Sequence, residues 1–368
     1  MNYDYLIVGA GLYGCAFARA ATDRGKRCLI VERKAHIGGS CYTERMADID
    51  VHMYGAHIFH TSDSAAWEFA LRFAHFNNYI NTPVANYNGT ILNLPFNMNT
   101  YCRLWHDVQT PAQAMARIDE QRAPYASITH PANLKEQALK LVGDDLYYTL
   151  VEGYSEKQWG RKATDIPPHY IKRLPLRFTF DNNYFTDVHQ GIPTEGYTHM
   201  MQRMTEGIEV RLNTDYLANR AELTALAART VYTGAIDALM DYRYGTLDYR
   251  SLRFEHRLMR GVSNYQGNAV VNHTAAQPAY TRTIEHKHFV FGTQPDTVVS
   301  TEYPTTYDGT NEPFYPIEDE RNRTLANRYQ EEARQQPDLW IGGRLAEYRY
   351  FDMDDTLIEV LCHPWLQP

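Results

Sequence analysis

The stretch Gly9-Ala10-Gly11-Leu12-Tyr13-Gly14 is the first group of residues whose types and spacing could do chemistry. It follows a GxGxxG pattern, whose glycines allow a tight turn, the close approach of a pyrophosphate to the backbone, and close packing of a helix on a strand. The apolar run Tyr5–Val8 precedes it, and an alanine-rich run follows it to about Arg24. A second apolar run, Cys28–Val31, ends at Glu32, an acid suited to hydrogen-bond a ribose hydroxyl. These residues predict a βαβ unit that binds a dinucleotide at the N-terminus of its helix.

Both NAD and FAD bind to this fingerprint, and residues further along the chain favour FAD. The glycine pair Gly38-Gly39 and the adjacent Ser40 follow closely after Glu32, a position where flavoproteins run the chain beside the cofactor's pyrophosphate. An ordinary surface turn stays the alternative for this pair. The runs Val231–Gly234 and Trp340–Arg344 each read as a strand that ends in a turn on the cofactor side.

Two histidines three residues apart, His57 and His60, are candidates for a metal pair or a general base. No acid or cysteine lies near them at metal-ligand spacing, so we expect no metal site. His286 and His288 alternate in a predicted strand, and we expect one structural and one exposed histidine rather than ligands. The five cysteines form no CxxC pair, which is typical of reduced, packed thiols.

Composition limits the classes of protein that the chain can represent. The 368 residues are 44% hydrophobic, enough for a large core divided over two or three units. A formal net charge of -8 argues against broad nucleic-acid affinity. No apolar run is long enough to span a bilayer and no basic, signal-like segment begins the chain, so we expect a cytoplasmic protein. The 28 tyrosines are a high count, and both packing at half-buried surfaces and lining of a cleft stay open for them.

The middle of the chain is predicted to be helical, with Pro111, Pro124 and Pro131 at the boundaries of its helices. Apolar residues recur there every four positions, the spacing of one buried helix face, at Leu134, Ala138, Val142, Leu146 and Leu150. Short β-type runs such as Ala269–Val271 and Phe289–Phe291 alternate with turn residues from about 245 to 310. They predict an antiparallel sheet.

Six longer stretches resemble the bacterial UDP-galactopyranose mutases, and the resemblance extends from about residue 3 to about residue 353. They are Tyr54–Thr61, Asn93–Met98, Gly153–Gly160, Arg177–Phe185, Ile284–Phe289 and Gly342–Tyr348. The resemblance implies an α/β protein with a Rossmann-like FAD-binding domain, an inserted helical domain and a six-stranded antiparallel β-sheet domain. We expect the FAD-binding domain at 1–75, 190–240 and 335–368, the helical domain at 95–172, and the sheet domain at 76–94, 173–189 and 241–334.

Family membership also implies roles for individual residues. Arg173 resembles a mobile-loop arginine that closes on the substrate diphosphate, and Arg282 resembles its partner. Each guanidinium offers a planar fork of donors that stays charged at neutral pH. His57, the third catalytic residue implied, lies beside the flavin ring. The implied substrate contacts are Asn81, Leu150, Tyr154, Ser155, Trp159, Tyr184, Tyr315 and Tyr350. The implied cofactor contacts are Gly9, Gly11, Leu12, Gly14, Glu32, Arg33, Gly39, Ser40, His57, Ile58, Gly343, Arg344, Tyr350, Asp352 and Met353.

The activity implied is an isomerase that interconverts UDP-galactopyranose and UDP-galactofuranose, and so supplies galactofuranose for cell-surface polysaccharide. N5 of the reduced flavin attacks the anomeric carbon, UDP departs, the sugar reopens and closes through its 4-hydroxyl, and UDP returns. The sequence offers no GxSxG motif or reactive-cysteine signature that would replace the flavin. UDP-galactose is then the partner, and a homodimer is expected because bacterial relatives are typically dimers.

Three alternatives stay open at this point. The chain could be an FAD-dependent oxidoreductase of the amine oxidase or desaturase type, or a mutase that prefers the N-acetylated sugar. A non-catalytic nucleotide-sugar-binding relative ranks low because both arginines are present. The chain departs from the family at two positions. Ser155 stands where the family usually has threonine, and Phe314 stands before Tyr315 where the family commonly has a second tyrosine, so one hydroxyl is lost. Its tail beyond Met353 is also atypical, and we expect that tail not to close on the first domain in the usual way.

Overall fold

Five parallel strands form the first sheet of the chain, in the order β16-β10-β1-β2-β9. The computed structural model describes residues 2–171 and 175–367. The five strands are β1 (Tyr3–Val8), β2 (Cys28–Val31), β9 (Glu209–Arg211), β10 (Ala227–Tyr232) and β16 (Leu339–Ile341). Strands β1 and β2 pair in register from Tyr5 with Cys28 to Val8 with Val31, as the predicted βαβ unit requires.

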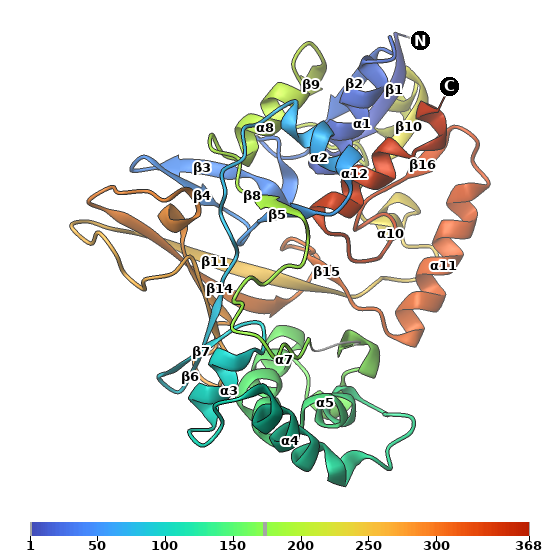
Figure 1. Ribbon diagram of the computed structural model, residues 1–368. Helices are drawn as coiled ribbons and strands as arrows, with labels where there is room; N and C mark the ends of the chain where they lie inside the picture. The colour runs from blue at the N-terminus through green and yellow to red at the C-terminus, as the bar shows by residue number, and fades with distance from the viewer. Residues whose placement is uncertain (1, 172–174, 368) are drawn as a thin grey trace.

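Helices cover both faces of this sheet, because successive strand residues point to opposite sides. Ile7 and Ile30 belong to the core on one face, whereas Leu6 and Leu29 belong to the core on the other. The first face is covered by α1 (Leu12–Thr22), α2 (Ser64–Leu71), α8 (Tyr197–Met204) and α12 (Met353–Leu361). The second face is covered by α9 (Arg220–Thr224), α10 (Ile236–Leu239) and α11 (Glu320–Arg334). Figure 1 shows this layered unit at the top, with both chain ends in it.

A second sheet has seven strands in the order β15-β11-β14-β13-β12-β6-β7. The strands are β6 (Val84–Tyr87), β7 (Thr90–Asn93), β11 (Tyr249–Met259), β12 (Val270–His273), β13 (Arg282–Glu285), β14 (Thr297–Thr306) and β15 (Tyr315–Pro316). All neighbours are antiparallel except β12 and β6, which run in the same direction. The predicted α/β class with a Rossmann-like unit, helices and a second sheet is confirmed.

Two details of that sheet differ from the prediction. The count of six antiparallel strands is wrong, because the β6–β7 hairpin arrives from a distant part of the chain and joins β12 in parallel, and because the two-residue β15 adds an edge. The predicted strand at Phe289–Phe291 is also wrong. A 3₁₀ turn (His286–Val290) follows β13 there, and Phe291, at φ 54°, turns the chain back towards β14.

The green and teal helices in the lower half of Figure 1 form a separate group with its own core. They are α3 (Met98–Leu104), α4 (Pro111–Arg122), α5 (Leu134–Val142), α6 (Asp144–Leu146) and α7 (Glu152–Trp159). All five residues of the predicted apolar stripe are buried, as expected. They do not lie on one continuous helix, because Gly143 breaks the run at φ 80° and a π-helical turn (Tyr147–Val151) precedes α7.

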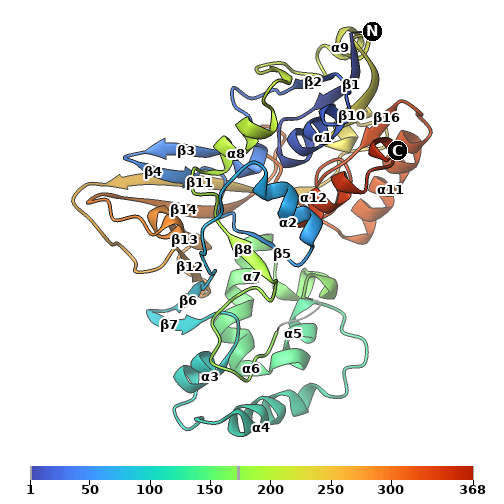
Figure 2. The same ribbon diagram turned by 45° about the horizontal axis from the view of Figure 1, so that its top comes forward.

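Two short ribbons connect these units. Strands β3 (Thr43–Met46) and β4 (Ile49–His52) form one, and β5 (Phe59–Thr61) and β8 (His189–Gly191) form the other. Figure 2 shows the second ribbon between the parallel sheet and the helical group. The expected domain boundaries place residues 320–334 with the second sheet, whereas α11 packs on the parallel sheet because Leu325, Ala326 and Tyr329 face its core. We propose to move that boundary to residue 319 and to keep the rest of the division.

The C-terminal tail, which we expected not to close on the first unit in the usual way, packs on that unit through aromatic side chains. Trp365 stacks on Tyr5 with ring centroids 5.9 Å apart, and the Tyr5 hydroxyl donates to the Trp365 carbonyl oxygen at 3.3 Å. His363 lies edge-on to Phe17 of α1 at 4.9 Å. The aromatic residues of the tail thus cover the helix that follows the glycine turn, which is why an atypical sequence still closes the domain.

All five cysteines are free, in agreement with the expected reduced thiols. No helix in the described part of the chain is long and apolar enough to cross a membrane.

Candidate active site

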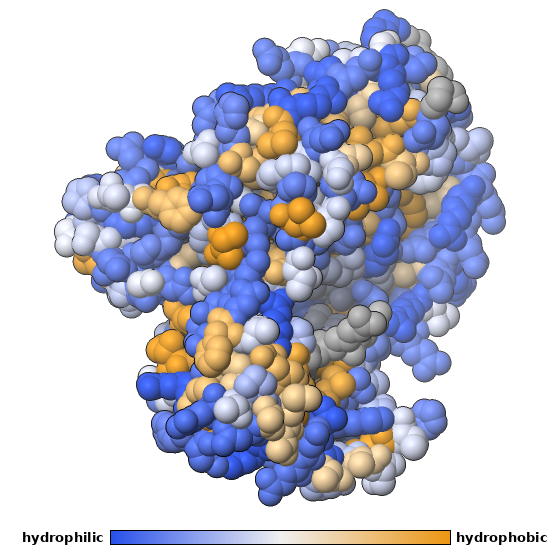
Figure 3. Space-filling view, in the orientation of Figure 1, coloured by the Kyte–Doolittle hydropathy of each residue, from blue (hydrophilic) through white to orange (hydrophobic). Residues whose placement is uncertain are grey.

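Two adjoining cavities of about 390 and about 600 Å³ lie where the seven-stranded sheet meets the parallel unit and the helical group. Five residues line both cavities, namely Tyr184, Asn272, Arg282, Tyr315 and Tyr350. Figure 3 shows a largely hydrophilic surface that is hollowed between the upper part and the lower, helical part. The two cavities therefore form one cleft with a junction. We call the smaller one the inner cavity and the larger one the outer cavity.

Most residues expected in the site line this cleft. The inner cavity is lined by Ser40, His57, Ile58, Asn81, Tyr184, Arg282, Tyr315, Arg344, Tyr350, Asp352 and Met353 from the expected set. The outer cavity is lined by Leu150, Tyr154, Ser155, Trp159, Tyr184, Arg282, Tyr315 and Tyr350. The expected residues Gly9, Gly11, Leu12, Gly14, Glu32, Arg33, Gly39 and Gly343 line neither cavity. Arg173 lies outside the described residues.

Arg282 sits at the junction and is held from two sides. Its Nε donates to the hydroxyl of Tyr154 at 3.0 Å, and its Nη1 lies 3.7 Å from Oε2 of Glu302. Glu302 is the direct cross-strand partner of Arg282 between β13 and β14, and it is only 1% exposed. Burial lowers the pKa of Arg282, but Glu302, Tyr154 and Tyr315 together outweigh that effect, and the pKa lies well above its ordinary value. The guanidinium therefore keeps its charge and a fixed direction.

Glu302 is absent from the expected site residues, and a signal for it exists in the sequence. It is the single charged residue of β14, which otherwise reads Thr-Val-Val-Ser-Thr and Tyr-Pro-Thr-Thr. A lone carboxylate in a buried β-type run needs a charged partner. That the partner is Arg282 depends on strand register, which the sequence does not reveal.

Tyrosine hydroxyls surround the junction as uncharged donors. Burial raises the pKa of Tyr154 to about 12 and raises that of Tyr315, so both stay protonated at neutral pH. Tyr315 and Tyr350 stack with centroids 6.2 Å apart, and the Arg344 guanidinium lies 4.7 Å from the Tyr350 ring. Tyr184 is 44% exposed at the rim. The junction thus combines positive charge with protonated hydroxyls, which suits a polyanionic group such as a diphosphate.

Several polar atoms near the cleft lack a hydrogen-bond partner among the described residues. They are the side-chain oxygens of Asn81, Gln158, Asn272 and Thr274. Buried polar atoms without a partner are rare, and near a cavity they indicate groups that a ligand satisfies. Gln158, Asn272 and Thr274 were not among the expected residues. Each stands in a run that reads simply as helix or strand, so nothing in the sequence singles them out.

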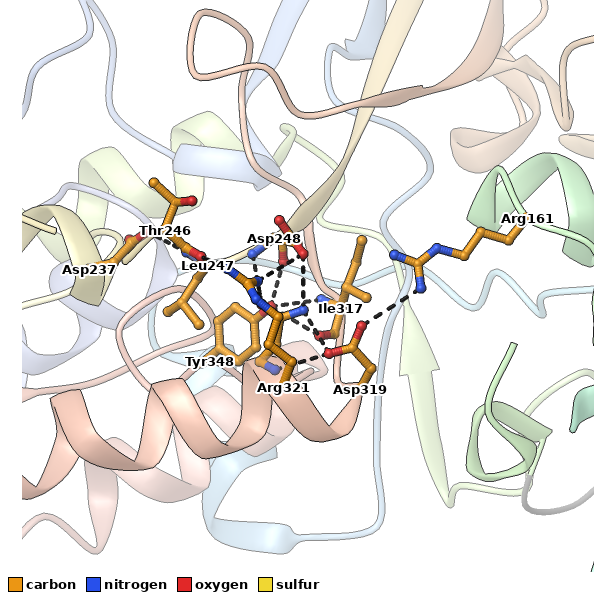
Figure 4. A network of polar contacts seen from close by, with 10 residues as sticks. Arg161, Asp237, Thr246, Leu247, Asp248, Ile317, Asp319, Arg321 and Tyr348 are labelled. Atoms are coloured by element: carbon orange, nitrogen blue, oxygen red, sulfur yellow. Dashed lines mark hydrogen bonds and ion pairs between the residues drawn. The ribbon is translucent and has the colours of Figure 1, made fainter. Parts of the chain in front are cut away.

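The apolar side of the outer cavity is suited to a flat ring. Leu150 and Trp159 line it, and Trp159 lies against Tyr170 with centroids 4.1 Å apart. Leu150 belongs to the π-helical turn before α7, a feature that is frequent at functional sites. Figure 4 shows a contact between the helical group and the parallel unit. Nη1 of Arg161, just after α7, lies 3.7 Å from Oδ2 of Asp319 at the N-terminus of α11.

The glycine turn is built as the GxGxxG pattern predicts. A Cβ on Gly14 would lie 2.0 Å from the Gly9 carbonyl oxygen, and one on Gly39 would lie 2.8 Å from the Gly11 Cα. Gly11 caps α1 without a side-chain hydrogen bond, and the first turn contains no acid. Glu32 accepts the backbone N–H of Ala10 at 2.8 Å and that of Lys34 at 2.9 Å. The helix N-terminus is therefore open to an anion.

His57 faces the inner cavity as a neutral imidazole. Its Nδ1 lies 2.8 Å from the Gly55 carbonyl oxygen, which can only accept, so Nδ1 carries the proton and Nε2 keeps a lone pair. Burial lowers its pKa to about 4. The backbone N–H of His57 donates to Nδ1 of His52 at 3.2 Å. The backbone N–H of His52 donates in turn to Nδ1 of His286, also at 3.2 Å. Two further neutral histidines thus position this loop.

His57 and His60, which the sequence offered as a metal pair, have other partners in the structure. No group of three or more His, Cys, Asp or Glu side chains that could hold a metal ion exists in the described part of the chain. His60 instead pairs with Asp187 at 2.8 Å and stacks on Phe185. His286, expected in a strand, lies in the 3₁₀ turn after β13 and is 1% exposed.

The buried histidines predict loss of stability in acid. Burial lowers the pKa of His52 to about 3 and that of His57 to about 4, whereas in the unfolded chain both titrate near 6.5. Below pH 6.5 the unfolded state therefore binds more protons than the folded state. As the pH falls from 6.5 to about 4, each of these two histidines should lower the free energy of unfolding by up to about 1.4 kcal/mol for every pH unit.

Urea unfolding at pH 7.5, 6.0 and 5.0 measures this fall. The exposed His106 provides a control, since His106→Gln should leave the pH dependence unchanged. Equal free energies of unfolding at pH 7.5 and 5.0 would contradict the prediction.

Comparisons with known proteins identify the family. The family model described as UDP-galactopyranose mutase matches residues 149–350, and a Rossmann-like NAD(P)-binding model matches residues 7–73. A probable UDP-galactopyranose mutase of Klebsiella pneumoniae is 36% identical over 98% of this chain and 93% of that protein. A dTDP-fucopyranose mutase of Escherichia coli is 35% identical over 97% of this chain and 96% of that protein. The crystal structure of a reduced UDP-galactopyranose mutase has the same fold, with a TM-score of 0.72 at 13% identity over 98% of this chain and 94% of that one. The chain belongs to the UDP-galactopyranose mutase family.

Proposed function

We propose that the chain interconverts UDP-galactopyranose and UDP-galactofuranose with FAD in its reduced state. The observation that carries the proposal is the charged Arg282 at the junction of the two cavities, bonded to Tyr154 and backed by the buried Glu302. Such a junction is suited to a diphosphate, with a sugar in the inner cavity and a nucleoside in the outer one. A nucleotide sugar has these three parts in this order.

The residues present fit FAD. The uncapped N-terminus of α1 would hold the pyrophosphate, and each Glu32 oxygen has capacity for a further hydrogen bond from a ribose hydroxyl. Ser40, Ile58 and Met353 line the inner cavity and would contact the flavin end. When bound and reduced, the flavin would supply the nucleophile that the side chains lack. We propose the other expected cofactor contacts, Arg33 and Gly343 among them, on the family resemblance.

The side chains of the junction would act on the departing nucleotide. Arg282 stabilises negative charge that develops on the diphosphate when its bond to the sugar breaks. Tyr315 and Tyr184 can donate to phosphate oxygens without adding charge. The hydroxyl of Tyr350 donates to Asp352 at 2.9 Å, so Tyr350 has to turn away from that carboxylate before it donates to a phosphate.

A second candidate is the corresponding reaction of dTDP-fucopyranose. It is favoured by the Escherichia coli relative, which is almost as similar to this chain as the Klebsiella pneumoniae one. The two substrates differ in the base, in the ribose 2′-hydroxyl and in the 6-hydroxyl of the sugar. The N-acetylated sugar remains a third candidate substrate. Putrescine oxidase has a TM-score of 0.55 at 12% identity, which supports a common fold and not an oxidase activity.

The decisive experiment incubates the FAD-loaded protein with UDP-galactofuranose, with and without dithionite. We expect UDP-galactopyranose to appear only in the reduced sample, without net flavin oxidation. UDP-N-acetylgalactofuranose and dTDP-fucofuranose are tested in parallel. Faster conversion of either would assign the substrate to it, whereas flavin turnover with an amine and no ring interconversion would make the chain an oxidoreductase.

Removal of the junction charge should slow the reaction strongly. We expect Arg282→Ala to lower turnover on the order of 10² to 10³-fold, as for other lost anion-stabilising donors. On the family resemblance we expect a similar loss for Arg173→Ala. Arg253→Ala is the matched control, because Arg253 lies on β11 of the same sheet and its side chain is 53% exposed. Near-normal turnover in Arg282→Ala would remove the main support for a diphosphate at the junction.

We also propose, on the resemblance to the family alone, that the chain acts in the cytoplasm as a homodimer and supplies galactofuranose for cell-surface polysaccharide. Sedimentation equilibrium of the FAD-loaded protein should give twice the chain mass of 42.5 kDa. A single species at the chain mass, at all concentrations, would exclude the dimer.

A further inference from the structure

The side chain of Lys157 joins helix α7 to the loop that leads into Arg282. Its Nζ donates to three carbonyl oxygens, those of His273 at 2.7 Å, Pro278 at 3.0 Å and Tyr280 at 3.0 Å. An ammonium group has three N–H donors, so all of them are used. We call these three hydrogen bonds the Lys157 clasp. The clasp connects the end of β12 with the residues just before β13.

The loop between β12 and β13 determines the position of the Arg282 backbone, because Arg282 is the first residue of β13. Tyr280, one of the three acceptors, lies only two positions before it. The backbone around the loop is also held by Thr281, whose N–H donates to the Glu302 carbonyl oxygen at 2.9 Å. The loop is therefore fixed on one side by β14 and on the other by the clasp.

The same face of α7 contacts Arg282 itself. Tyr154 precedes Lys157 by three positions, the spacing that places two side chains on one face of a helix. Its hydroxyl accepts from Arg282 Nε. Gly153 allows α7 to lie close to the backbone after β12, because a Cβ at this position would lie only 2.5 Å from the Thr274 carbonyl oxygen. Figure 1 shows α7 at the boundary between the helical group and the seven-stranded sheet.

We propose that Lys157 is a positioning residue for Arg282. The clasp fixes the position of the loop relative to the Tyr154 hydroxyl, so that the Arg282 guanidinium points into the junction. This inference rests on the proposed function for the identity of the ligand, a nucleoside diphosphate. Lys157 itself lines neither cavity, so its effect on a ligand passes through Arg282. A loss of the clasp should therefore weaken binding only while Arg282 is present.

The variant Lys157→Met tests this, since it keeps the aliphatic stem and removes all three donors. The C-terminal end of α7 has a separate anchor, because Arg250 Nε donates to the Gln158 carbonyl oxygen at 2.9 Å, and the variant should fold. We expect UDP to bind the FAD-loaded variant roughly 10- to 100-fold more weakly, the size of effect that small misplacements produce. Lys157→Arg should recover part of this loss. Lys162→Met is the matched control, because Lys162 pairs with Glu156 at the surface.

A double-mutant cycle with Arg282→Ala, measured by calorimetric titration with UDP, separates a positioning role from a general structural one. We expect Lys157→Met to change the Kd less than about threefold in the Arg282→Ala background. Equal losses in both backgrounds, or no loss with Arg282 present, would overturn the inference. If Lys157→Met does not fold, Gly153→Ala disturbs the same contact and enters the same cycle.

UDP binding does not depend on ring interconversion, so the two proposals fail in different ways. A wild-type protein that binds UDP without isomerising the sugar contradicts the proposed function and leaves the cycle to decide on Lys157. A wild-type protein that isomerises the sugar but gives an additive cycle contradicts the positioning role alone. If the activity assay selects the thymidine nucleotide, dTDP replaces UDP in the titrations.

Discussion

A guanidinium that is to bind a diphosphate, as we propose for Arg282, has to stay charged and hold one direction before the ligand arrives, and the contacts around Arg282 meet that requirement. Arg282 is partly removed from water, which disfavours its charge, and the buried carboxylate of Glu302 offsets this cost together with Tyr154 and Tyr315. The pair needs β13 and β14 to be adjacent and in register, with the two residues directly opposite. The long antiparallel part of the second sheet provides that register.

The parts of the fold that could be predicted from the sequence are those determined by local rules. The glycine turn, the first helix and the acid at the end of β2 follow each other within residues 3–32, and each has a backbone reason that the sequence displays. The stripe from Leu134 to Leu150 was correctly read as core, although Gly143 breaks the helix. Strand count and direction were not predictable, because the pairing of β6 with β12 joins segments more than 180 residues apart in the sequence.

The residues of the candidate site also fall into those that the sequence predicted and those that it did not. Arg282, Tyr154 and Tyr315 were expected from the family resemblance, and the structure brings them to one junction. Glu302, Asn272 and Thr274 were missed, since a carboxylate or an amide on a strand, or a hydroxyl just after one, is informative only when its neighbour is known. The tail was missed for another reason. Its aromatic residues, such as Trp365, match no family pattern, yet any flat apolar ring of suitable size can stack on Tyr5.

The three units of the chain meet at the junction, and each contributes a different physical property. The parallel unit provides an open helix N-terminus for an anion, the second sheet provides the paired charge, and the helical group provides Tyr154 and the apolar wall. Some contacts between the units are polar and specific, such as Arg161 with Asp319 and Lys157 with three carbonyl oxygens, and others are apolar, such as Leu92 of β7 in the core of the helical group. Hydrogen bonds of this kind fix direction better than apolar packing does, because their geometry is narrow. A site assembled from three units needs that directional control more than it needs added stability.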